Sequence, residues 1–194
     1  MKNLIKLLLP AILLGCELPC AEISRVSDLG PLPEEVLGIM PYEDGETVSF
    51  LYAGDTTVHM EVAREMTKQY EYYQDECSKI TTVYRIDMTE MATADSAFAI
   101  LAWVTNLAVP DWYQVVVNDS YFHIPVSPHA YEEADILDSL TVNGVVYYNV
   151  CRSPRVGIEP EDSTAPVADS LFFNTGYGFL EIVMADGSRY QRQE

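Results

Sequence analysis

Apolar and polar residues alternate with a period of two along much of this chain, a pattern typical of half-buried β-strands. The alternation first appears on either side of Gly54-Asp55, which predicts a hairpin over about 47–66. The longest alternating run occupies 80–88. The polar, tyrosine-rich stretch 68–79 is expected to be a loop or an extension of a strand.

The middle of the chain is apolar with fewer clear boundaries. Residues 92–106 contain alanines that tolerate a helix, but Trp103 and Val104 favour a strand. The other elements predicted in this region are strands at 112–117 and 121–126 and a short helical turn within 129–136.

The last third of the chain has the clearest turn signals. Asn143-Gly144 is the strongest short signal for a type I′ hairpin turn, and the proline-containing stretch 153–170 is expected to be an exposed loop. The strands predicted here are 140–142, 145–151, 171–174, 179–184 and 188–192. About ten strands joined mostly by short turns predict a mainly β fold, an antiparallel β-sandwich or barrel-like domain, over 42–194.

The N-terminus has the order of a secretory signal. Lys2 and Lys6 precede an apolar run from Leu7 to Leu14. This run is much shorter than the roughly 20 residues of a membrane-spanning helix. Beyond the signal, prolines and glycines recur through 16–41, so this segment is expected to be an extended tether.

The tetrapeptide Leu13-Leu14-Gly15-Cys16 at the end of this signal resembles the lipobox of bacterial lipoproteins. The resemblance implies that the signal, residues 1–15, is removed and that Cys16 becomes the lipidated N-terminus. Two or more acyl chains hold a protein stably on a bilayer. The chain is therefore expected to be an outer-membrane lipoprotein that faces the periplasm or the cell surface.

The charge balance narrows the range of partners. The chain has 11 basic and 30 acidic residues, and removal of Lys2 and Lys6 with the signal would change the net charge from −19 to about −21. Nucleic-acid binding needs a basic surface, so no nucleic-acid partner is expected. A basic patch that attaches the protein to anionic lipids is not expected either, which leaves the anchoring to the lipid.

The cysteine count leaves two alternatives open. If Cys16 is lipidated, Cys20, Cys77 and Cys151 remain, and an odd number leaves at least one cysteine without an intramolecular partner. Cys77 and Cys151 both lie in the expected domain and in an oxidising compartment. A Cys77–Cys151 disulfide is therefore one hypothesis, and free thiols are the other.

Two further parts of the chain resemble small β-rich lipoproteins of Bacteroidetes-type bacteria. The hairpin of 141–150 is followed by an aromatic strand, a Gly-x-Gly-type turn and a final hairpin closed by Asp186-Gly187. The opening segment 42–56 is similar to the first strand pair of those proteins. The resemblance implies an envelope location and a β fold.

No catalytic or metal-binding motif appears in the sequence. There is no Gly-x-Ser-x-Gly elbow, no histidine pair with zinc-site spacing, no calcium loop and no phosphate loop, so no cofactor or metal is expected. Aromatic residues are numerous, and four tyrosines near turns or on alternating faces are candidate ligand-binding side chains, unless they only serve the strands. These are Tyr72, Tyr73, Tyr148 and Tyr177.

Two functions fit these observations. The first is a membrane-anchored, non-enzymatic binding or structural module for an envelope protein, a glycan or an apolar ligand. The second is a small periplasmic hydrolase with a site that one sequence does not reveal. The hydrolase would gather His123, His129 and acidic residues in a polar cleft with a strongly perturbed pKa, whereas the binding module would present an exposed aromatic patch on a filled core.

Overall fold

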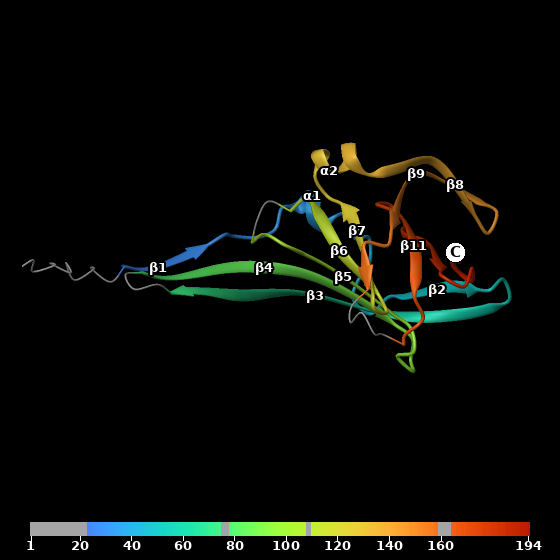
Figure 1. Ribbon diagram of the computed structural model, residues 1–194, viewed down its shortest axis with the longest axis horizontal. Coiled ribbons are helices and arrows are strands. Elements are labelled where there is room, and N and C mark those ends of the chain that lie inside the picture. The colour runs from blue at the N-terminus through green and yellow to red at the C-terminus, as the bar shows by residue number, and fades with distance from the viewer. Residues whose placement is uncertain (1–22, 75–77, 108–109, 159–163) are drawn as a thin grey trace, which may run out of the picture.

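The computed structural model describes residues 23–74, 78–107, 110–158 and 164–194. Within this part of the chain, thirteen strands form one large sheet that is not closed into a barrel, and every strand pairing except one is antiparallel (Figure 1). The strands are β1 (Ile23–Asp28), β2 (Thr47–Tyr52), β3 (Thr56–Gln74), β4 (Ser78–Ala92), β5 (Ala99–Thr105), β6 (Trp112–Val117), β7 (Ser120–Pro125), β8 (Asp135–Val142), β9 (Val145–Pro154), β10 (Gly157–Ile158), β11 (Ala168–Asn174), β12 (Gly178–Met184) and β13 (Arg189–Arg192), and the helices are α1 (Glu34–Leu37) and α2 (Pro128–Glu133). The predicted mainly β, antiparallel fold is confirmed.

The sheet folds over on itself. Its strand order is β10-β7-β6-β5-β4-β3-β2-β13-β12-β11-β9-β8, yet β7 contacts β9 and β11 from the other end of this order. The backbone amide of His123 donates to Ser153 Oγ at 3.1 Å, and that of Ala168 donates to Ser120 Oγ at 3.0 Å. The two halves therefore enclose a core that includes Phe50, Phe122 and other fully buried side chains.

The prediction of an extended tether over 16–41 is wrong for its described part, residues 23–41, which belongs to the folded domain. Residues 16–22 lie outside the described part, but β1 pairs with β4 in parallel, and the segment that contains α1 packs on the domain. Leu32, Val36, Ile39 and Met40 are buried in the main core. Pro31 lies in a bend and Pro33 is the N-cap residue of α1. The burial of the apolar residues between the prolines outweighs the tendency of proline to leave a chain extended.

A hydrogen-bonded charge pair holds this N-terminal segment in place. Arg64 on β3 makes two hydrogen bonds to the Asp87 carboxylate on β4, at 3.1 and 2.8 Å. The remaining guanidinium donors reach the main-chain carbonyls of Leu37, Met40 and Tyr42 at 2.8–3.0 Å. Asp87 raises the pKa of the Arg64 guanidinium through these hydrogen bonds. One charged cluster thus joins two core strands to the segment around α1.

β3 and β4 are much longer than the sequence predicts. The stretch 68–79 contributes strand residues on both sides of its undescribed centre, so the prediction of a strand extension was the right alternative there. Beyond the point where Thr105 ends the pairing of β5 with β4, β1 takes the place of β5 along the same edge. The three-stranded projection made of β1, residues 65–74 and residues 78–85 is called the arm, and it extends away from the body in Figure 1.

Most of the remaining predicted elements are present. The strand option for 92–106 is confirmed by β5, although 93–98 form a turn. Asn143 and Gly144 adopt φ values of 49° and 83° between β8 and β9, as a type I′ turn requires. The predicted loop 153–170 is shorter than expected, because β10 forms within it and β11 begins at Ala168.

Candidate ligand-binding groove

Both tryptophans of the chain lie on the outer face of the sheet. On β5, Ile100, Ala102 and Val104 point into the core, so Trp103 points outward. Trp112 begins β6 in the same way, one position before the fully buried Tyr113. Each indole is half-buried, so it presents an apolar surface that is partly open to solvent.

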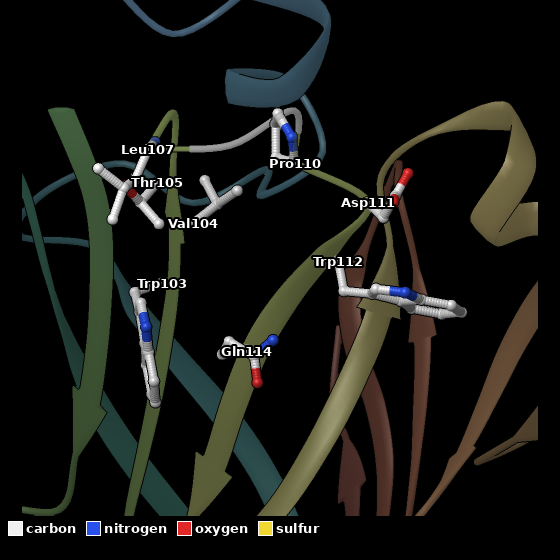
Figure 2. A pocket seen from close by; sticks show the side chains of 8 residues that line it. All are labelled: Trp103, Val104, Thr105, Leu107, Pro110, Asp111, Trp112 and Gln114. Atoms are coloured by element: carbon white, nitrogen blue, oxygen red, sulfur yellow. The ribbon is translucent and has the colours of Figure 1, made fainter. Parts of the chain in front are cut away.

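A shallow hollow lies between these two tryptophans (Figure 2). Its volume is about 320 Å³. The lining residues are Trp103, Val104, Thr105, Leu107, Pro110, Asp111, Trp112 and Gln114. Gln114 pairs in register with Trp103, and its amide lies between the two indoles in Figure 2. The hollow therefore combines the Trp103 ring with one central hydrogen-bonding group and a carboxylate at its rim, while Trp112 lies at its edge with its ring directed away from Trp103 (Figure 2).

A second hollow of about 240 Å³ adjoins the first, because Trp112 lines both. It lies between β7, the start of β8 and the end of β9, and its polar lining residues include His123, Glu133, Asp135 and Arg152. The Trp112 and His123 rings are 6.0 Å apart between centroids. The two hollows together are called the tryptophan groove.

The rim of the tryptophan groove is fixed by hydrogen bonds rather than by packing alone. Ser127 Oγ donates to the Asp111 carboxylate, and the same oxygen accepts from the Ala130 amide as the N-cap of α2. The Val126 amide donates to the Asp111 carbonyl at 2.7 Å. These bonds position Asp111 beside Trp112 and fix the start of α2, whose last residue, Glu133, lines the second hollow.

The groups around the second hollow carry both signs of charge. Arg152 lies 3.6 Å from Asp135, and His129 lies 3.6 Å from Glu133. Burial lowers the pKa of His123 below its ordinary value, so this imidazole is neutral near pH 7 and acts as one donor and one acceptor. The hollow can therefore offer hydrogen bonds of several types without a net positive charge.

Cys151 lies at the back of the second hollow and is a free thiol. Burial, with a smaller effect from Asp135, raises its pKa to about 12, which opposes nucleophilic chemistry because the thiolate is the reactive form. Cys77 lies outside the described residues, so its hypothesised disulfide with Cys151 stays a prediction from the sequence. The described ends of β3 and β4 on either side of Cys77 lie at the end of the arm, away from β9 (Figure 1).

The arrangement expected of a hydrolase is met only in part. His123 lines the second hollow with Glu133 and Asp135, whereas His129 does not line it and is exposed on α2. In the described part of the chain, a serine–histidine hydrogen bond joins Ser49 Oγ to His59 Nδ1 at 2.9 Å, and it lies on the exposed face of β2 and β3, outside the tryptophan groove. Among the same residues, no group of three or more metal-ligating side chains gathers.

The four tyrosines predicted to bind a ligand are exposed, but the structure does not bring them together. Tyr72 and Tyr73 lie on the arm, while Tyr148 lies on β9 and Tyr177 in the turn before β12. Tyr177 packs edge-on against Tyr147, with ring centroids 5.0 Å apart. Tyr147 is buried and Tyr148 is exposed, as expected for consecutive strand residues.

The sequence analysis did not predict the tryptophan groove, although the sequence contained a signal for its two tryptophans. The alternation on β5 and β6 assigns Trp103 and Trp112 to the solvent face, where a large apolar side chain is informative. The nearness of His123 and Arg152 had no such signal, because β7 and β9 meet only through the folding of the sheet.

Another aromatic hollow lies at Tyr52 and Tyr190. Its rings already pack against each other, with centroids 4.6 Å apart, and Tyr190 also stacks on Phe98 at 4.0 Å. These aromatic faces are satisfied within the protein. The tryptophan groove is therefore the stronger candidate for a ligand.

Comparisons with protein-family models, with curated proteins and with solved structures found no match. Neither of the two helices in the described part of the chain has the length and apolar character needed to cross a membrane. Cys16 lies outside the described residues, and its lipidation stays a prediction from the sequence.

Proposed function

We propose that this protein is a cell-envelope lipoprotein, anchored through Cys16, and that its β domain is a non-enzymatic module that binds a glycan in the tryptophan groove. The observation that carries the proposal is the position of both tryptophans. Trp103 and Trp112 are half-buried on the outer face of the sheet, and two adjoining hollows with hydrogen-bonding groups lie beside them. The anchor is supported by the sequence around Cys16.

Sugars need this combination of surfaces. A pyranose ring has an apolar face of C–H groups that packs on an aromatic ring, and hydroxyls around its edge that need donors and acceptors. Trp103 and Trp112 supply the apolar surfaces, while Gln114, Asp111 and His123 supply the polar partners. The first hollow, of about 320 Å³, lies at the lower end of the roughly 300–1,000 Å³ range of small-ligand sites, and the second, of about 240 Å³, lies just below it.

The charge of the protein selects among glycans. The chain carries a net charge of −19, and Asp111, Glu133 and Asp135 lie around the groove with Arg152 as a basic lining residue. An anionic polysaccharide would be repelled by this field. The preferred ligand is therefore an uncharged or amino-bearing oligosaccharide.

The hydrolase alternative has less support. A nucleophilic cysteine needs a lowered pKa, whereas burial raises that of Cys151. His123 can donate and accept hydrogen bonds to a ligand without taking part in a reaction. The same side chains are thus better suited to holding a sugar than to cleaving it.

The test is a calorimetric titration of the protein with a panel of neutral and amino-sugar oligosaccharides, such as malto-, cello- and chito-oligosaccharides. Trp103→Ala and Trp112→Ala are expected to weaken binding at least tenfold, because a buried aromatic anchor is typically worth about 2 kcal/mol or more. Tyr148→Ala is the matched control, since it removes an exposed aromatic ring outside the groove. The glycan proposal is contradicted if tight binding survives both tryptophan substitutions. It is also contradicted if no oligosaccharide of the panel gives a measurable heat of binding.

The anchor is tested separately by the intact mass of protein extracted from membranes. Acyl mass is expected on Cys16, and Cys16→Ala is expected to be released in soluble form. Identical processing and solubility of the two proteins would refute lipidation and leave the glycan proposal to stand on its own titration.

A further inference from the structure

The arm is built so that its end and the start of the described chain lie together. β1 runs parallel to β4, with Ile23 in register with Ser78 and Asp28 in register with Val83. The last pair between β3 and β4 is Gln74 with Lys79. The chain therefore enters the structure beside the end of the β3–β4 pair, which is called the tip of the arm (Figure 1).

This placement limits how far the tip can be from a lipid on Cys16. Cys16 is seven residues before Ile23, and seven residues span at most about 25 Å when fully extended. The arm also projects toward the end at which Ile23 lies. The six residue steps from Lys68 to Gln74 alone cover about 20 Å in this direction. If Cys16 carries the anchor, the tip is the part of the domain that lies nearest to the membrane.

The tip carries aromatic side chains on both of its faces. Tyr72 is in register with Thr81, which is in register with Val26, and these three share one face. The adjacent row places Tyr73 opposite Ile80 on the other face. Tyr72 is 76% exposed, Tyr73 60% and Val26 70%. A flat partner protein would cover one face of this arm, whereas the headgroup layer of a bilayer surrounds a tip and reaches both.

The arm also differs from the body in charge. Segments 23–28 and 65–85 together contain four basic and five acidic residues, whereas the rest of the chain beyond residue 15 contains five basic and twenty-five acidic residues. Counted from the row in which Ile23 pairs with Ser78, Lys79 is in the second row and Arg25 is in the third. The arm as a whole is therefore nearly neutral, and it can approach phospholipid headgroups without the repulsion that the acidic body would experience.

We infer that the tip of the arm lies in the headgroup region of the membrane to which Cys16 is anchored. This inference rests on the lipid anchor of the proposed function. Tyrosine suits this position because its ring is apolar and its hydroxyl stays hydrated, which is why tyrosine is enriched at membrane–water interfaces. The lipid and the tip would make two separate contacts with the bilayer. The body would then be held at a defined orientation, with the hairpin of β8 and β9 directed away from the membrane (Figure 1).

The experiment places one tryptophan as a reporter on the full, membrane-extracted protein. In a Trp103→Phe/Trp112→Phe background, Tyr72→Trp reports on the tip, and Tyr148→Trp is a matched control at a 66% exposed position on β9. Each variant is reconstituted into vesicles of phosphatidylethanolamine and phosphatidylglycerol, with and without brominated acyl chains. Tyr72→Trp is expected to lose most of its fluorescence in brominated vesicles, and Tyr148→Trp is expected to remain unchanged.

Sedimentation of the vesicles separates the ways in which this inference fails. If both variants sediment with the vesicles and are quenched equally or not at all, the anchor stands and the position of the tip is refuted. If Cys16 carries no acyl mass and neither variant sediments, the anchor and the position of the tip fail together. A blue shift of Tyr72→Trp without quenching, together with a doubled mass in detergent, would instead show that a second copy covers the arm and would overturn the membrane contact.

Discussion

The charge pair between Arg64 and Asp87 leads to the sharpest prediction about stability. Replacement of Arg64 by methionine keeps an unbranched stem but removes the charge that faces Asp87, whose side chain is 2% exposed. The carboxylate would keep the Tyr113 hydroxyl, which donates to it at 2.7 Å, and lose both guanidinium bonds. The carbonyls of Leu37 and Met40 would lose their donor as well.

The cost of Arg64→Met follows from the carboxylate that is left behind. Removal of one partner of a buried ion pair typically costs about 3–5 kcal/mol, because the other charge stays desolvated without compensation. Each kcal/mol shifts the melting temperature of a domain of this size by about 2–4 °C, so a decrease of about 6–20 °C is expected. Urea unfolding followed by tryptophan fluorescence measures the free energy directly, since both tryptophans lie in the folded body.

Two further variants isolate the cause of this effect. Arg152→Met removes an arginine from a pair in which both side chains are about half exposed, 3.6 Å from Asp135, and should cost only about 0–1 kcal/mol. Asp87→Asn in the Arg64→Met background removes the stranded charge and should recover part of the loss. The reasoning is refuted if Arg64→Met is no more destabilising than Arg152→Met, or if the second substitution at Asp87 adds to the loss.

Three other outcomes are expected. Gly178→Ala should destabilise the fold by more than about 2 kcal/mol, because a Cβ at this φ of 82° would overlap the buried Tyr42 ring. Gly144→Ala, at a similar φ with open space around it, should cost about 1 kcal/mol. Equal losses of unfolding free energy in denaturant would contradict this. Cys151 should resist iodoacetamide in the native protein at pH 8, because burial raises its pKa to about 12, and peptide mapping should find it alkylated only after denaturation; labelling of the folded protein would refute the burial argument. Burial lowers the pKa of His123 in the folded protein, so as the pH falls below about 6.5 the unfolded state binds the proton first, and the contribution of His123 to stability is complete above that pH and is lost as the pH falls toward the native pKa. His123→Gln should therefore lose less stability than the wild type between pH 7 and pH 5. Parallel profiles of unfolding free energy against pH for the two proteins would argue against this.

The sequence alone determined the fold class and most of the strands. The alternation of apolar and polar residues reports which side of each strand is buried, and turn signals such as Asn143-Gly144 report where strands end. Both are local properties, so they were readable without knowledge of the partners. Consecutive strand residues face opposite sides, and the structure accordingly buries Tyr147 and exposes Tyr148.

The sequence misled where local chemistry and long-range packing disagree. Prolines at 31, 33 and 41 predicted a tether, but Val36 and Met40 are buried in the core. Arg64 on β3 also donates hydrogen bonds to main-chain carbonyls of this segment. The pairing of β1 with β4 is also a contact between distant parts of the sequence. No local pattern encodes such a partner.

The candidate groove shows the same division. The outward direction of Trp103 and Trp112 follows from strand alternation, but the presence of His123 and Arg152 beside Trp112 depends on how the sheet folds over on itself. The sequence thus determined what kinds of side chain face the solvent. Only the tertiary structure decided which of them share a hollow, because a site is assembled from strands that pair or pack across long separations, and burial in a common core selects those neighbours.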